Sequence, residues 1–453
     1  MEVRITGSLP KGSIKIGDID FGKFGPEDHK RFSREFAPHN YHQIPGWVVD
    51  GVGKEDCTLL LKRQREGRVE GKQVLDFQAM YSVHNFGYKE IYNHIVHDVV
   101  EYLIYQRAPK AIPRAQDHKY HSPAIEAVRQ STGLDCVLMK SGGVETVETA
   151  CNIASKFWYK THNQRGQNFN VFIVAQNNFH GRSNRARSFS SSPSAREGYG
   201  PFLSNVHHVK YGNIDHLKTA LELYRGNAVA FIVELVQGEG GVFVPPHDYI
   251  PSAKELCEKY GTLFIADEIQ TGFGRTGRDW AYEHYDILPD LLCAGKAAGG
   301  GILPVSFVAG RKVIMSCIDP GTEGATWSAA PIQCVALVAA IRELSLNKLS
   351  QKSADKGDAF LAYLNKVRER FPNLITDIRG QGLFVGIDTV FDAQKFSEVL
   401  LEKGVWAKET GVTREDGTMK TIRFSPPLTI SDTQLQNCAH AFESVLKIFK
   451  NRA

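Results

Sequence analysis

Residues 263–280 read LFIADEIQTGFGRTGRDW, and this stretch decides the fold class. A short apolar run, typical of a buried strand, leads into Asp267 and Glu268, and a glycine-containing turn segment follows. In open α/β sheets, ligands gather outside the carboxyl ends of the strands, where we expect the side chain of Asp267. A second interpretation stays open here, because aspartates at strand ends commonly cap the turn or helix that follows.

A lysine in an unusual setting lies in residues 289–310, PDLLCAGKAAGGGILPVSFVAG. Lys296 stands between an apolar run and a triple glycine, Gly299–Gly301. Such a lysine is either a surface residue with a packed stem or a residue held where its amine can be neutral. A neutral amine is what Schiff-base chemistry requires. Asp267 and Lys296 are about one strand–helix–strand step apart, so they are considered together.

The whole chain has the composition of an ordinary globular protein. Its 453 residues exceed what one core usually supports, so two or more domains are expected. A formal net charge of +4 without long blocks of one sign gives little support to nucleic acid as a partner. The 8 cysteines form no CxxC pair or zinc spacing and are expected to be reduced thiols. Since neither a signal core nor a long apolar span is visible, we expect a cytoplasmic protein without a membrane segment.

Strands and helices alternate from about residue 85 to 330, which predicts a largely parallel sheet covered on both faces. The expected strands are 170–175, 228–234, 262–266 and 305–309, with helices near 145–159, 216–224 and 249–259. Residues 53–77 are expected to form a hairpin with a charged turn. Beyond 330 we expect helices at 331–346 and 353–370, a strand near 383–387, a helix near 393–403 and a closing helix from Asp432. The predicted division is an N-terminal segment (1–75), a large domain (76–330) and a smaller C-terminal α+β domain (331–453).

The segments ADEIQTGFGRTG and GKAAGGGILPVS together resemble the signature of class III (subgroup II) aminotransferases, which have pyridoxal-phosphate fold type I. The resemblance extends from about Arg31 to Phe449. Within the class, HNYHQIP, SGGVETVETACN, NFHGRS, QGEGG and IRFSPPL most resemble ornithine δ-aminotransferases. It implies pyridoxal 5′-phosphate bound covalently to Lys296, with Asp267 on the pyridinium nitrogen of the ring.

The resemblance also implies how the cofactor is held. A glycine turn that opens a helix binds phosphate through its backbone N–H groups, although SGG alone would be read as a plain loop. The implied cofactor residues are Gly142, Gly143, Val144, Phe179 over the ring face, His180 beside it, Gln270 on the phenolic oxygen, and Thr326 from the neighbouring subunit of a homodimer. Glu234 is a further candidate in the network beside the ring.

Substrate recognition is implied in the same way. Guanidinium groups bind carboxylates in bidentate fashion. By resemblance, Arg423 takes the α-carboxylate of glutamate, Arg182 takes the distal one, and Glu239 pairs with Arg423 when the substrate is a diamine. Tyr41 and Tyr81 match tyrosines that line the ornithine pocket. Structural alternatives stay open, because surface salt bridges would explain the charged residues and ordinary packing the tyrosines.

Several positions depart from the family pattern. Trp327-Ser328-Ala329-Ala330 replaces the usual aromatic-Gly-Gly-Asn, Leu235 replaces a proline, and residues 104–115 lack the usual aromatic- and serine-rich segment. The leading hypothesis is transfer of the ω-amino group of L-ornithine to 2-oxoglutarate. The alternatives are another class III reaction, on lysine, acetylornithine or 4-aminobutyrate, an amino-acid racemase, or a non-enzymatic binding protein that kept the fold.

Overall fold

The computed structural model describes residues 47–65, 68–105, 118–162, 170–413 and 419–451. The chain forms two compact units, residues 1–53 with 58–74, and residues 54–57 with 75–453. In the first unit, β1 (Val48–Val52) pairs antiparallel with β2 (Thr58–Arg65), and β2 neighbours β3 (Arg68–Asp76). The hairpin expected within 53–77 is therefore present. The division into three domains at 75 and 330 stays a prediction.

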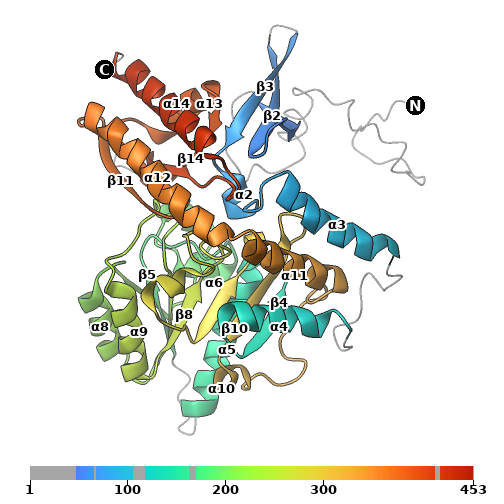
Figure 1. Ribbon diagram of the computed structural model, residues 1–453. Coiled ribbons are helices and arrows are strands. Elements are labelled where there is room, and N and C mark those ends of the chain that lie inside the picture. Colours follow the sequence, from blue (N-terminus) through green and yellow to red (C-terminus); the bar gives the residue numbers. More distant parts are fainter. Residues whose placement is uncertain (1–46, 66–67, 106–117, 163–169, 414–418, 452–453) are drawn as a thin grey trace, which may run out of the picture. The chain divides into compact units, whose positions relative to one another are not determined.

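A seven-stranded sheet forms the centre of the second unit (Figure 1). Its strand order is β4 (Cys136–Lys140), β10 (Ser306–Gly310), β9 (Leu291–Ala294), β8 (Leu263–Asp267), β7 (Ala228–Glu234), β5 (Val171–Ala175) and β6 (Val206–Val209). Only β10 runs antiparallel to its neighbours β4 and β9. The sheet is thus mixed and mostly parallel, as the sequence predicts.

Helices cover both faces of this sheet because successive strand residues point to opposite sides. In β8, Phe264 and Ala266 join one buried cluster, whereas Leu263 and Ile265 join the other. The first cluster includes residues of α4 (His121–Thr132), α8 (Ile214–Leu223), α9 (Tyr249–Tyr260) and α11 (Pro331–Leu346). The second includes residues of α5 (Gly143–His162), α6 (Asn184–Phe189) and α10 (Lys312–Met315).

Shorter elements complete this region. They are α2 (Ala79–Ser82), α3 (Glu90–Tyr105), α7 (Pro193–Arg196) and the 3₁₀ turns η4 (Ala281–Tyr285) and η5 (Lys296–Gly299). Of these, η4 connects β8 to β9, and η5 connects β9 to β10 at the edge of the sheet. That edge is where the candidate site lies.

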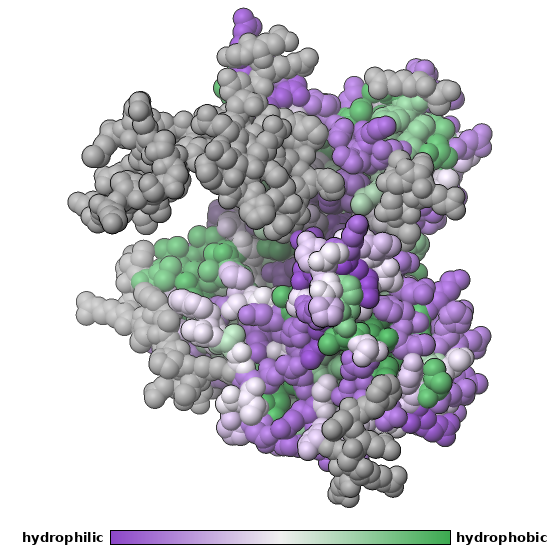
Figure 2. All heavy atoms as spheres, turned by 180° about the vertical axis from the view of Figure 1, so that it is seen from behind, coloured by the Kyte–Doolittle hydropathy of each residue, from purple (hydrophilic) through white to green (hydrophobic). Residues whose placement is uncertain are grey.

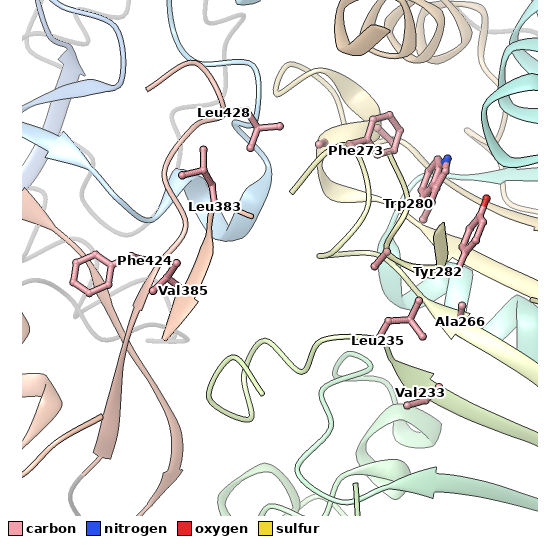
Figure 3. Close-up of a cluster of buried hydrophobic side chains, with 14 of the residues drawn as sticks. Val233, Leu235, Ala266, Phe273, Trp280, Tyr282, Leu383, Val385, Phe424 and Leu428 are labelled. Carbon is pink, nitrogen blue, oxygen red and sulfur yellow. The ribbon is translucent and has the colours of Figure 1, made fainter. Parts of the chain in front are cut away.

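The C-terminal region contains a second, four-stranded sheet with the order β11 (Ile375–Gln381), β12 (Phe384–Thr389), β15 (Met419–Phe424) and β14 (Lys408–Thr413). All of its pairings are antiparallel. The helices here are α12 (Leu349–Arg370), α13 (Ala393–Glu402) and α14 (Asp432–Lys450), and β13 (Val405–Trp406) pairs with the end of β3. Buried side chains from this sheet and from the turn after β8 belong to one apolar cluster (Figure 3).

The predicted elements are confirmed where apolar periodicity is strong. The helix expected at 331–346 has those bounds, and the predicted strands and helices of the large sheet lie within a few residues of those observed. The small C-terminal sheet differs from the prediction, because it has four strands where the sequence predicts a single strand near 383–387. The 8 cysteines are free and all but Cys136 are buried, in agreement with the expected thiols.

The surface is mixed in character. The face in Figure 2 is hydrophilic over much of its area, with separate apolar patches. Among the described residues, no helix combines the length and the apolar character needed to cross a membrane.

Candidate active site

The candidate residues gather at one edge of the seven-stranded sheet. Five of its strands, β4, β5, β7, β8 and β9, are parallel to one another, so their carboxyl ends lie together. The residues that follow these ends, in chain order, are Gly142–Val144, Phe179 and His180, Glu234, Asp267 and Lys296. The strand-end rule applied to Asp267 in the sequence therefore brings the whole set to one place.

Asp267 is the last residue of β8 and is 4% exposed. Its Oδ2 lies 2.7 Å from Nδ1 of His180, and its Oδ1 accepts the N–H of Ile269 at 3.1 Å. The capping interpretation thus describes one oxygen of the carboxylate but not the other. Burial of His180 opposes protonation, but the hydrogen bond and charge of Asp267 outweigh burial and raise the pKa of the imidazole.

Glu234 supports the segment that carries the aromatic candidate. Its carboxylate accepts the N–H of Phe179 at 2.7 Å and that of Gly238 at 3.1 Å. Burial raises the pKa of Glu234 to about 7, although the charge of His180 and these hydrogen bonds oppose the rise. The ring of Phe179 is 39% exposed, so it is not an ordinary core residue. Its backbone is fixed while its ring is open to contact.

Lys296 follows β9 and begins η5 with a left-handed backbone, φ 48°. The side chain is partly buried, which favours a residue held in a site over one on the surface. Burial lowers the pKa of the amine to about 8, against the opposing charge of Glu239, and Arg423 lowers it further. Asp267 and Glu234 also act on this amine. A neutral amine is thus accessible close to physiological pH.

The turn after β4 forms a ready anion site. Glu145, in the first turn of α5, accepts the N–H groups of Ser141 at 3.1 Å and Gly142 at 2.8 Å. This is one half of a capping box and orders the turn. The N–H groups of Gly143 and Val144 lie in the first helical turn, beyond reach of any carbonyl of their own helix. They are therefore suited to hold a phosphate at the positive end of the helix dipole.

Two glycines bring the surrounding loops close to this turn. A Cβ on Gly181, where φ is +119°, would lie 2.5 Å from Cγ2 of Val144. A Cβ on Gly143 would lie 3.2 Å from Cγ2 of Ile269. Glycine at these positions therefore lets the loop after β5 and the turn after β8 approach the phosphate turn.

The unsatisfied groups fit a planar cofactor with a ring oxygen. Nε2 of His180 and Nε2 of Gln270 are buried without hydrogen-bond partners in the part of the chain that the structure describes. Buried donors are normally satisfied, so each of these atoms is suited to a bound group. With Lys296, Asp267 and the phosphate turn, the donors and acceptors match pyridoxal 5′-phosphate.

The guanidinium of Arg423, in β15, is fully buried beside this group. Its Nη1 donates to Oε1 of Glu239 at 2.6 Å, and its Cζ lies 5.3 Å from the centre of the Tyr81 ring. Its Nε and Nη2 are buried without partners among the described residues. Burial disfavours the charged form of Glu239, but the charge and hydrogen bond of Arg423 prevail and lower the carboxyl pKa. The expected ion pair between Glu239 and Arg423 is therefore present, and it leaves two donors of Arg423 available among the described residues.

The remaining predicted site residues are exposed or lie outside the described part of the chain. Arg182 is exposed, and its guanidinium carbon lies 5.7 Å from the centre of the Phe179 ring. Thr326 is exposed in the turn before α11, and no described hydrogen bond joins it to the other candidates. Tyr41 lies outside the described residues. Of the departures, Leu235 is fully buried in the core (Figure 3), and Trp327 is 57% exposed.

Sequence reasoning missed three supporting residues, Glu145, Gly181 and Asp76. Asp76 ends β3 and accepts the N–H groups of Gln78 and Ala79, which begin the turn that carries Tyr81. The signal was available, since Asp76 follows a strand-like run as Asp267 does. For Glu145 the signal was a carboxylate three residues after the glycine turn.

Comparison with known proteins agrees with this geometry. The family model described as aminotransferase class III matches residues 54–446. An ornithine aminotransferase from Geobacillus sp. (strain WCH70) is 33% identical over 423 residues, which cover 92% of this chain and 97% of the relative. The crystal structure of the ornithine aminotransferase from Toxoplasma gondii ME49 has a TM-score of 0.84 at 29% identity, covering 95% of this chain and 97% of that one. An acetylornithine aminotransferase from Elizabethkingia anophelis has a TM-score of 0.79 at 34% identity, covering 94% and 99%.

Proposed function

The chain belongs to the class III aminotransferase family, and we propose that it transfers the ω-amino group of L-ornithine to 2-oxoglutarate. The products are glutamate 5-semialdehyde and glutamate. The observation that carries the proposal is the ion pair between Glu239 and the buried Arg423, next to Lys296. Such a pair allows one pocket to accept a diamine and a diacid in turn.

The cofactor of the family is pyridoxal 5′-phosphate, and a solved relative from Toxoplasma gondii is described with this cofactor at its active site. When bound, it supplies an aldehyde for the amino group and a ring that accepts the electron pair released at the substrate carbon. In our proposal Lys296 holds the aldehyde and Asp267 holds the proton on the ring nitrogen. Gly143 and Val144 bind the phosphate, with Gly142 capping their helix, and Gln270 donates to the ring oxygen. Phe179 covers the ring face, and His180 orients Asp267.

Lys296 also moves the proton in this proposal. Its lowered pKa, about 8, allows the amine to accept a proton from the substrate carbon and to return it. Asp267 is paired with His180, and the raised pKa of His180 favours the imidazolium. The contact between Asp267 and His180 therefore keeps the partner of the ring nitrogen in place while the proton moves between Lys296 and the substrate.

Substrate alternation follows from exchange of partners at Arg423. With ornithine bound, Glu239 neutralises Arg423, and Arg182 takes the α-carboxylate of the substrate. With 2-oxoglutarate bound, the α-carboxylate replaces Glu239 on Arg423, and Arg182 takes the distal carboxylate. Nε and Nη2 of Arg423 have no partner among the described residues, so they are available for bidentate binding of the incoming carboxylate when Glu239 leaves Nη1. Tyr81 and Tyr41 are assigned to the wall around the amine.

A second candidate is acetylornithine as the amino donor. It is favoured by the likeness to the Elizabethkingia anophelis enzyme. Lysine, 4-aminobutyrate and a racemase reaction on the same scaffold are tested together with it. A racemase does not require the Glu239–Arg423 exchange, so glutamate formation from 2-oxoglutarate separates it from the aminotransferases.

We also propose a homodimer with shared active sites, in which the exposed Thr326 contributes to the phosphate site of the partner. Since one chain has a mass of 50.4 kDa, light scattering of the holoprotein tests for twice that value. A Thr326→Val variant is expected to keep this mass and to bind the cofactor more weakly. Unchanged cofactor affinity would remove Thr326 from the site.

The decisive experiment is a half-reaction screen. Cofactor-loaded protein is mixed with L-ornithine, acetylornithine, lysine and 4-aminobutyrate in separate experiments, and the loss of the aldehyde absorbance is followed. We expect the fastest reaction with L-ornithine and recovery of the absorbance with 2-oxoglutarate. Faster reaction with another donor would replace ornithine in the proposal, and no recovery with 2-oxoglutarate would exclude the assigned acceptor.

A further inference from the structure

A left-handed turn carries Tyr81 to the site. Ala79, Met80, Tyr81 and Ser82 have φ values of 42°, 47°, 59° and 74°. None of them is glycine, and consecutive left-handed residues are sterically unfavourable because each Cβ approaches the following carbonyl oxygen. Such a run persists only where the surrounding structure holds it.

Asp76 is the group that holds this turn. It is 1% exposed, and its backbone is fixed by pairing with Trp406 in β13. Its Oδ1 accepts the N–H of Gln78 at 2.8 Å and that of Ala79 at 3.0 Å, and its Oδ2 accepts the hydroxyl of Tyr88. One buried carboxylate therefore fixes the start of the left-handed run.

The turn is also tied to the strand of Arg423. Ser425, two residues beyond Arg423, donates its N–H to the carbonyl of Phe77 at 2.8 Å and its hydroxyl to that of Gln78 at 3.2 Å. On the other side of this connection, the Tyr81 ring lies against the Arg423 guanidinium at 5.3 Å. A shift of the turn would therefore change the surroundings of an arginine that has unsatisfied buried donors among the described residues.

We propose that Asp76 is a positioning residue for carboxylate recognition: it holds the left-handed turn so that the Tyr81 ring keeps Arg423 oriented towards a dicarboxylate. The inference rests on the proposed exchange of Glu239 for substrate at Arg423. Asp76 acts through Tyr81 and Ser425 and does not touch substrate. Its loss weakens binding of dicarboxylates more than reaction with a diamine.

The test uses the cofactor-loaded enzyme and glutarate, an unreactive five-carbon dicarboxylate. In Asp76→Ala, we expect glutarate to bind about tenfold more weakly by calorimetry, as for the loss of a hydrogen bond to a charged acceptor. We expect the KM for 2-oxoglutarate to rise by a similar factor and the KM for ornithine, whose pocket wall also includes Tyr81, to rise less. Asp76→Asn, which keeps an acceptor oxygen, should restore most of the affinity, as should Met80→Gly added to Asp76→Ala, because glycine adopts left-handed conformations without the Cβ penalty.

Asp56→Ala is the matched control. Asp56 accepts the N–H groups of Cys57 and Tyr88 but none from the turn. We expect it to lower stability without separating the two half-reactions. If Asp76→Ala does not fold, Tyr88→Phe replaces it, with an expected loss of about threefold in glutarate affinity, since only one anchoring hydrogen bond is removed.

Failure of this inference and failure of the proposed function give different results. Unchanged glutarate affinity in the Asp76 variant, or equal losses in both half-reactions, overturns the role of Asp76 and leaves the proposed function standing. If the wild type binds glutarate but does not react with ornithine, the donor assignment fails, and the glutarate comparison still decides the role of Asp76. If the wild type does not bind glutarate, both are overturned.

Discussion

Replacing Glu239 by glutamine provides the most direct test of substrate alternation. The change removes the charge that neutralises the buried Arg423 but keeps the size of the side chain. In the wild type, Oε1 of Glu239 lies 2.6 Å from Nη1 of Arg423, and 2-oxoglutarate must displace it. In Glu239→Gln that competition is weaker, so we expect tighter binding of 2-oxoglutarate and poorer use of ornithine, whose ω-ammonium meets an unneutralised guanidinium.

The magnitude follows from the geometry of the pair. A hydrogen bond between charged groups contributes about 1.5–3 kcal/mol, and the 32% exposure of the Glu239 side chain favours the lower end through solvent screening. About 1.4 kcal/mol corresponds to a tenfold change in an equilibrium constant. We therefore expect the Kd of 2-oxoglutarate to fall about tenfold and the KM of ornithine to rise by a similar factor.

The assay follows the cofactor absorbance in the two half-reactions separately, by stopped-flow mixing. Asp377→Asn is the matched control, because it removes a carboxylate from Arg379, which keeps Asp388 and the carbonyl of Gly241 as partners. We expect this control to change neither half-reaction. Weaker binding of 2-oxoglutarate in Glu239→Gln, or a change of the same sign and size for both substrates, would refute the exchange.

Three further predictions concern the cofactor residues. The rate of covalent cofactor attachment to the apoprotein should rise with pH through an apparent pKa near 8, because burial lowers the pKa of Lys296 and only the neutral amine reacts. Lys296→Ala should show no attachment and no turnover. A midpoint near 10.5 in the pH profile of the wild type would contradict the assignment. In Asp267→Asn, the burial that lowers the pKa of His180 is no longer opposed by the charge of Asp267, so the His180 pKa should fall in an NMR titration. Turnover should drop by orders of magnitude. An unchanged His180 pKa would show that Asp267 does not control it. Gly181→Ala should lower the free energy of unfolding by about 2 kcal/mol or more and should also weaken cofactor binding. Gly198 also has a positive φ, but there is open space around the position of its Cβ, so Gly198→Ala should lower the free energy of unfolding by only about 1 kcal/mol and leave cofactor affinity unchanged. Equal effects of the two substitutions would mean that the contact with Val144 is unimportant.

The elements of the fold that were predictable are those set by local pattern. Helix α11 was predicted with its observed bounds because a proline opens a long apolar repeat that ends before polar residues. Strand β8 was predictable because all of its residues are buried, which requires a continuous apolar run. In β14 and β15, by contrast, charged residues such as Lys408, Lys420 and Arg423 interrupt the pattern. Their strand structure depends on pairing between distant segments, which periodicity does not reveal.

The same distinction between local patterns and contacts of distant segments applies to the candidate site. The position of Asp267 follows from a local rule about strand ends. The partners of Arg423 do not, since Glu239 lies 184 residues away and Tyr81 reaches the guanidinium from a left-handed turn. Only the resemblance to a known family predicted that Glu239 pairs with Arg423. The observed contacts of Arg423 with Glu239 and Tyr81 agree with this resemblance.

A comparison of two strand-end aspartates shows what sequence pattern alone cannot separate. Asp76 and Asp267 are both buried at the ends of strands, and both carboxylates accept an N–H from the chain that follows them. The oxygens of Asp76 are taken up by its own turn and by Tyr88, twelve residues on. Asp267 instead contacts His180 from the loop after β5, and Nε2 of that ring has no partner among the described residues. Among the described residues, the unsatisfied buried atoms of His180, Gln270 and Arg423 lie at the candidate site and are suited to a ligand, whereas both carboxylate oxygens of Asp76 already have partners.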